Sequence, residues 1–283
     1  MNLPFLGRDR GDGPEPVQVI GLLRFSYFGD GGFRGVPADP AAAAAYLFDD
    51  ERLARRFHLF ETLTVPTLAA QTDPDFTLVV LTSDALPGRH RDRLQAAVDR
   101  IPGARLCAQP PLPQWRAVRN AFNPARSRRP ALTAQFRLDD DDALATDFVA
   151  ELRRHAPQLE PLRRLTGAPG VALDFTRGLR LVWGAAGVET VAQNRRIHTS
   201  QGMALVTRDR GEKNIMGYPH HKIWQHIPMV SLNEPLMFLQ SSHRDQDSGM
   251  AAGKPLTAIA PAEAAGLLRR RFGLDLRALA APG

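Results

Sequence analysis

Four consecutive aspartates, Asp139 to Asp142, follow directly after the stretch TAQFRL at residues 133–138. Neighbouring carboxylates repel one another, so a fold keeps them together only where something offsets their charge. Divalent cations do this well, because Mg²⁺, Mn²⁺ and Ca²⁺ prefer hard oxygen ligands. The preceding stretch has the apolar character of a buried strand, and ligands of α/β sheets gather at the carboxyl ends of strands. The run therefore predicts a cation site rather than a solvated acidic turn.

The order of the side chains within this run divides the four aspartates into two pairs. Successive residues of a strand point in opposite directions, so Asp139 and Asp141 share one orientation. An Asp-x-Asp pair can hold a divalent ion that bridges the phosphates of a nucleotide diphosphate and assists its departure. Asp140 points elsewhere and is predicted to be dispensable, with Asp140→Ala far milder than Asp141→Ala.

The elements that position this run alternate between strands and helices in the first half of the chain. Apolar runs predict strands at residues 17–25, 76–81, near 105–108 and at 133–138. One helix is predicted to begin near residue 49, and another to span residues 87–100. Such alternation predicts an α/β fold with a mixed, mostly parallel sheet flanked by helices. The second half is less regular: a hairpin is predicted from residues 171–175 and 179–183, and strands at 203–207 and 235–240.

Composition narrows the partners and the compartment. The 283 residues contain one cysteine, Cys107, and no apolar run near the ~18 residues of a membrane span. One cysteine cannot form an internal disulfide, so a cytoplasmic location is expected. The net charge of +6 suits phosphate-bearing ligands or an anionic membrane surface. No nucleic-acid partner is expected, because no aromatic-studded basic stripe accompanies the charge.

Several segments, in this order, resemble a known family. They are Arg24-Phe25-Ser26, the stretch QTDPDFTLVVL at 71–81 followed by Thr82-Ser-Asp84, the pair Arg119-Asn120, and FRLDDDDA at 136–143. Together they are similar to the bacterial rhamnosyltransferases, a family of GT-A type glycosyltransferases, over roughly residues 17–247. The resemblance implies a metal-dependent enzyme that moves a sugar from a nucleotide-diphosphate donor to a glycan or glycolipid acceptor. The name of the family gives this sugar as rhamnose.

The resemblance also implies roles for individual residues. Asp84 would contact the nucleotide base, and Asp139 would contact the ribose or the sugar. Asp139 and Asp141 would together bind the Mn²⁺ or Mg²⁺, with Asp142 as an additional ligand. A further metal ligand comes from a histidine in the C-terminal half, for which His243 fits best and His220 and His221 are the rivals. The arginines Arg24, Arg119 and Arg137 are expected to pair with diphosphate oxygens.

The catalytic base stays open at this point. It must be a carboxylate or imidazole within hydrogen-bond reach of the acceptor hydroxyl. The eligible residues are Glu212, Asp209, His221 and Asp245.

The resemblance implies a single GT-A-like domain over residues 17–250. Its nucleotide-binding half is predicted at 17–142 and its acceptor-binding half at 143–250, after a flexible tail at 1–16. Residues 251–283 are predicted as a C-terminal amphipathic helix. The arginines at 269–271 offer a peripheral contact with the inner membrane through residues 261–279, although packing as a terminal helix is the favoured alternative.

Two other functions are compatible with an aspartate run. One is a phosphohydrolase with an Asp nucleophile, although such motifs usually lie on the first strand with Thr or Val where this chain has Ala143. The other is a cation-dependent carbohydrate-binding protein with a structural calcium site, although the spacing of an EF-hand is absent.

Overall fold

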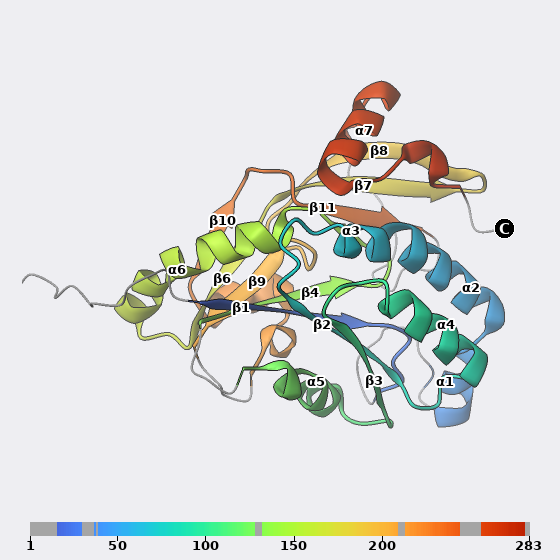
Figure 1. The fold of residues 1–283 in the computed structure, drawn as a ribbon, viewed down its shortest axis with the longest axis horizontal. Helices are drawn as coiled ribbons and strands as arrows, with labels where there is room; N and C mark the ends of the chain where they lie inside the picture. Colours follow the sequence, from blue (N-terminus) through green and yellow to red (C-terminus); the bar gives the residue numbers. More distant parts are fainter. Residues whose placement is uncertain are drawn as a thin grey trace, which may run out of the picture.

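The computed structural model describes residues 16–29, 37, 39–127, 132–208, 213–243 and 256–280 (Figure 1). The predicted flexible tail, apart from Pro16, lies outside the described residues. Three of the base candidates, Asp209, Glu212 and Asp245, lie outside them as well.

The larger sheet has seven strands in the order β10-β6-β9-β4-β1-β2-β3. Only β9 runs antiparallel to its neighbours β4 and β6, so the other six strands are parallel to one another. Their carboxyl ends therefore meet at one edge of the sheet. The bounds are β1 Val17–Arg24, β2 Thr77–Ser83, β3 Ala104–Gln109, β4 Leu132–Asp139, β6 Gly170–Phe175, β9 Met203–Thr207 and β10 Met229–Leu232. The predicted α/β class with a mixed, mostly parallel sheet is confirmed.

Helices cover both faces of this sheet because its central strand is apolar on both sides. In β1, Val19 and Leu23 face one hydrophobic cluster, while Ile20 and Leu22 face another. Figure 1 shows α6 and α5 on opposite sides of the sheet. The first cluster packs against α2, α3, α4 and α6, and the second against α5. The bounds are α1 Pro40–Leu47, α2 Asp50–Leu59, α3 Val65–Ala69, α4 Gly88–Val98, α5 Gln114–Phe122 and α6 Phe148–Thr166, with a π-helical turn at Phe60–Thr64 joining α2 to α3.

A second sheet of four strands, in the order β5-β11-β7-β8, follows the aspartate run. Its bounds are β5 Ala143–Leu144, β7 Arg177–Gly184, β8 Gly187–Arg195 and β11 Phe238–Ser242. The predicted hairpin of residues 171–175 with 179–183 is wrong, because β6 and β7 belong to different sheets. β7 instead pairs antiparallel with β8, and Gly187 at the turn has φ of 134°, which favours glycine.

The segment after residue 256 packs against the second sheet as a broken helix (Figure 1). It comprises α7 Pro261–Leu267, a π-helical turn Leu268–Phe272 and a 3-10 turn Leu276–Ala278. The helical turn ends at Gly273, which has φ of 66° and so favours glycine. Leu268 and Phe272 are buried in the main core, so this helix packs as part of the domain.

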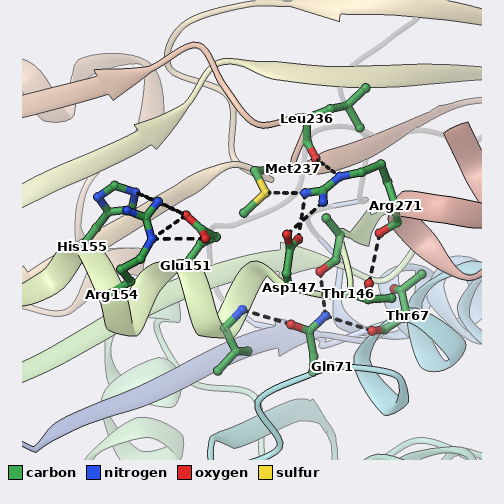
Figure 2. Close-up of polar contacts among 12 residues, drawn as sticks. Thr67, Gln71, Thr146, Asp147, Glu151, Arg154, His155, Leu236, Met237 and Arg271 are labelled. Atoms are coloured by element: carbon green, nitrogen blue, oxygen red, sulfur yellow. Dashed lines mark hydrogen bonds and ion pairs between the residues drawn. The ribbon is translucent and has the colours of Figure 1, made fainter.

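Arg271 fastens this segment to the junction between β5 and α6 (Figure 2). Its guanidinium donates to both carboxylate oxygens of Asp147 at 2.8 Å and to the carbonyl of Leu236 at 3.1 Å. Its own carbonyl accepts from the N–H of Thr146 at 2.9 Å. Of the three arginines predicted to meet a membrane, Arg271 is therefore engaged within the chain. Membrane contact through the exposed Arg269 and Arg270 stays a prediction.

Gln71, within the stretch that carries the family resemblance, supports the same junction from the other side (Figure 2). Its amide nitrogen donates to the carbonyl of Ala145 at 2.8 Å, and its amide oxygen accepts from the N–H of Val149 at 3.0 Å. The second bond satisfies a free donor in the first turn of α6.

In the described part of the chain, no helix is both long and apolar enough to cross a membrane.

Candidate functional site

The aspartate run forms a tight turn between β4 and β5, at the carboxyl edge of the large sheet. The N–H of Asp142 donates to the carbonyl of Asp139 at 3.3 Å and closes this turn. Asp140 and Asp142 are buried, with 1% and 3% of their surfaces exposed. Asp139 is half-buried and Asp141 retains 16% side-chain exposure at the edge of the sheet. The side chains therefore fall into the two pairs that the strand period predicts.

Asp140 is bound to Arg56 of α2 by two hydrogen bonds. The Nε of Arg56 donates to Oδ2 at 2.9 Å and its Nη2 donates to Oδ1. Burial raises the pKa of Asp140 to about 6, against the opposing charge of Arg56. Asp140 therefore neutralises a buried guanidinium, which gives it a role in the packing of α2 against the turn. That Asp140→Ala is milder than Asp141→Ala for the function of the site stays a prediction.

Asp142 is held by hydrogen bonds on both of its carboxylate oxygens. Its Oδ1 accepts from the N–H of Ser241 in β11 at 2.8 Å, and its Oδ2 accepts from the amide of Gln201. The hydroxyl of Thr64 donates to its carbonyl at 2.7 Å. Burial, followed by the charges of Asp141 and Asp139, raises the pKa of Asp142 well above its usual value. This geometry fits a residue that joins the two sheets better than one that binds a metal.

Asp141 meets the predicted histidine. The Nε2 of His243, one residue after β11, lies 2.9 Å from Oδ2 of Asp141, and both side chains are partly exposed. Burial raises the pKa of Asp141, but the bond from His243 and the charge of Arg56 outweigh it and leave that pKa below its usual value. A carboxylate and an imidazole thus converge at the sheet edge, although their residues are 102 positions apart in the sequence.

Asp139 is the last residue of β4, where the turn begins. Its Oδ2 accepts from the hydroxyl of Ser200 at 3.2 Å. The charges of Arg137 and Asp139 both act on His220, whose pKa falls to about 4 mainly through burial. His220 is therefore the histidine close to Arg137 and Asp139, while His221 beside it is exposed.

The remaining residues predicted to bind the sugar donor lie at the same edge of the sheet or in α5, which packs against one face of the sheet. Arg24 ends β1 and is the register partner of Asp139 in β4. Asp84 follows β2 and is exposed. Burial raises the pKa of Tyr27, and the charge of Asp84 adds to that shift, so the two side chains lie near each other. Arg119 is half-buried in α5, the helix that packs under β1 and β2.

The sequence did not point to the segment before β9, which supplies several contacts of the site. Besides Ser200 and Gln201, its His198 donates its N–H to Oδ2 of Asp174 at 2.8 Å. Burial raises the pKa of Asp174, and its Oδ1 has no hydrogen-bond partner among the described residues. The one available signal was a carboxylate inside the otherwise apolar strand VALDF at 171–175.

The possible metal ligands at this edge suit an ion that a substrate helps to coordinate, rather than an ion held by protein side chains alone. Within the described ranges, no group of three or more His, Cys, Asp or Glu side chains could hold a metal by itself. Asp141 and His243 supply one oxygen and one nitrogen donor. Mg²⁺, and Mn²⁺ by analogy, is commonly held by one or two carboxylates, with substrate phosphates and waters completing the shell. The residues therefore fit such an ion when it arrives with a diphosphate.

Comparison with known proteins identifies the family of this chain. The family described as "Putative rhamnosyl transferase" matches residues 18–255. The chain belongs to this family of glycosyltransferases. A search of curated proteins found no match.

Solved structures with a similar course of the chain include those of S. aureus TarS. The structure of its residues 1–349 in complex with UDP has a TM-score of 0.45 and 9% identity, over 80% of this chain and 61% of that one. The complex with UDP-GlcNAc has a TM-score of 0.42 and 8% identity, over 89% of this chain and 64% of that one. The chain thus spans less than two thirds of these TarS structures.

Proposed function

We propose that this protein is a metal-dependent glycosyltransferase that moves a sugar, rhamnose, from a nucleotide-diphosphate donor to a glycan or glycolipid acceptor. The observation that carries the proposal is the Asp141–His243 pair beside Asp139, at the carboxyl edge of a mostly parallel sheet. The family match to residues 18–255 supports the sugar-transfer chemistry.

Asp141 and His243 would hold Mn²⁺ or Mg²⁺, which when bound neutralises the charge of the departing diphosphate. Asp139 stands on the same turn with Oδ2 toward Ser200, where a carboxylate can accept hydrogen bonds from hydroxyl groups of the donor. Arg24 and Arg137 add positive charge next to Asp139, which favours the diphosphate over water at this edge.

The other two functions receive less support from the same geometry. A calcium site takes six to eight oxygen ligands, but Asp140 and Asp142 already satisfy Arg56, Ser241 and Gln201. A phosphohydrolase needs a free nucleophilic carboxylate at the end of its first strand, where this chain has Arg24. Sugar transfer would use Asp139 and Asp141, the two carboxylates of the run that stay partly exposed.

The experiment measures nucleotide binding with and without metal. Calorimetric titration of the full chain with UDP, UDP-GlcNAc and a nucleotide-diphosphate-rhamnose should show binding that needs Mn²⁺. Asp141→Asn and His243→Ala should weaken it at least about tenfold, the effect of losing one charged contact. Asp92→Asn, an exposed aspartate in α4, is the matched control and should bind like the wild type. Equal binding without metal, together with an unaffected Asp141→Asn variant, would overturn the proposal.

A further inference from the structure

An arginine in the second sheet is held in place by neighbouring amides. Arg180 lies in the middle of β7 and is half-buried. Its Nη2 donates to the Oε1 of Gln240 in β11 at 2.9 Å, and the same oxygen accepts from the Nδ2 of Asn194 in β8 at 2.9 Å. The guanidinium is therefore preorganised across three strands, but its bonded partner is a neutral oxygen that it shares.

Among the described residues, no carboxylate forms an ion pair with this guanidinium. The Nε of Arg180 is buried and has no hydrogen-bond partner in the part of the chain that the structure describes. Arg196 directly follows β8, and its N–H donates to the carbonyl of Thr176 at 2.9 Å, so the register puts it on the same face of the sheet as Asn194 and Arg180. Burial, followed by the charge of Arg196, lowers the pKa of Arg180, while Asp142 opposes this shift. Both oxygens of Asp142 are occupied by Ser241 and Gln201, so it does not pair with the guanidinium. Buried donors are costly unless they are bonded, so a further acceptor is expected.

The charge of Asp142 acts on Arg180, so this arginine lies near the aspartate run, although it is not part of the Asp141–His243 pair. β11 runs between β5 and β7, so the strand that carries Gln240 also leads to His243 three residues later. The N–H of Ser241, in the same strand, is bonded to the aspartate run. An anion bound by Arg180 would thus lie on the side of the site built by residues 143–243, away from Arg24 and Asp84.

We propose that Arg180 and Arg196 bind an anionic group, a carboxylate or a phosphate, that the acceptor carries. This inference rests on the proposed function. Arginine suits such a group because its planar fork matches the oxygens of carboxylates and phosphates. The acceptor is the source because Asp141, His243, Arg24 and Arg137 already offer cationic or metal-held contacts to the donor diphosphate. The enzyme would therefore prefer an acidic glycan or a phosphate-bearing acceptor over a neutral one.

The test compares small anionic and neutral probes on the full chain with Mn²⁺, both with and without UDP. Methyl glucuronide carries a carboxylate, glycerol 1-phosphate carries a phosphate, and methyl glucoside is the neutral match. Nuclear magnetic resonance titration should show at least one anionic probe binding about tenfold or more tightly than methyl glucoside. The probe that binds more tightly shows whether the acceptor's anionic group is a carboxylate or a phosphate.

Arg180→Gln and Arg196→Gln should each remove that preference and leave the affinity for UDP unchanged. Arg196 is exposed, so its replacement tests the subsite without disturbing the packing of β7. Arg195→Gln, which removes the same charge from an exposed neighbour in β8, should retain the preference.

Three results separate this inference from the proposed function. If the wild type binds UDP with Mn²⁺ but does not distinguish the probes, the inference is wrong and the proposed function stands. If Arg180→Gln or Arg196→Gln weakens UDP tenfold, the arginine pair serves the donor, which also overturns the inference. If UDP does not bind the wild type, the proposed function fails, and probe binding measured without nucleotide still decides whether the anion subsite exists.

Discussion

Replacing Asp140 with alanine is expected to destabilise the whole domain. Arg56 and Asp140 are 8% and 1% exposed and share two hydrogen bonds, so the substitution leaves a buried guanidinium without this carboxylate. Removing one partner of a buried ion pair typically costs about 3–5 kcal/mol. Because the free energy of unfolding of a domain is about 5–15 kcal/mol, the loss would be a large share of the total.

Chemical denaturation followed by circular dichroism measures this loss. A double-mutant cycle sharpens it, because Arg56→Met combined with Asp140→Leu replaces the ion pair by apolar side chains. Such replacements of a buried pair are often neutral or stabilising, so the double variant should recover most of the stability. Asp141→Asn, in the same run but partly exposed, should lose less stability while losing metal-dependent nucleotide binding. The reasoning is refuted if Asp140→Ala unfolds within about 1 kcal/mol of the wild type.

Three further outcomes are expected elsewhere in the fold. The bond from Arg163, with those of two other arginines, holds the pKa of Glu160 down to about 2. The ionised carboxylate should therefore contribute at most about 3 kcal/mol to the free energy of unfolding above pH 5, and this contribution is lost as the pH falls toward 2. Denaturant titration should then show that Glu160→Gln destabilises the protein at pH 7 and has almost no effect at pH 2. Arg271→Ala should lower the free energy of unfolding by about 2 kcal/mol, because it removes charged hydrogen bonds; no change in a thermal melt relative to Arg270→Ala would contradict this. Gly21→Ala would place a Cβ 2.3 Å from an aromatic ring of β4 and should cost about 1–3 kcal/mol of stability, with a normal melting curve as the contrary result.

Local patterns in the sequence were enough to predict the parallel part of the fold. The apolar runs ending at Phe25, Leu81 and Leu138 became β1, β2 and β4, because strands buried on both faces need continuous apolar residues. The burial of the aspartate run alternates as the two-residue period predicted, although Asp140 to Asp142 lie in a turn and not in the strand itself. Asp141 and His243 are brought together because each follows the end of a predicted strand.

The second half was harder because its contacts are not local. A single residue, Thr176, links β6 and β7, so the pattern of two adjacent strands looked like a hairpin although the chain changes sheets there. Ser200 and Gln201 meet their aspartates across 61 and 59 positions of sequence, from a segment with no regular period. The role of Asp140 was missed for the same reason, since its partner Arg56 lies 84 positions earlier in an amphipathic helix.

The clamp at Arg271 sets an order of events during synthesis of the chain. Asp147, its partner, is 124 residues earlier, so at about 5–20 residues per second it leaves the ribosome roughly 6–25 s before Arg271 does. During that interval the nascent chain can build the parallel strands β1 to β4, but the junction of β5 and α6 waits for its clamp. The turn that carries Asp139 to Asp142 would therefore be among the last parts of the newly synthesised protein to become rigid.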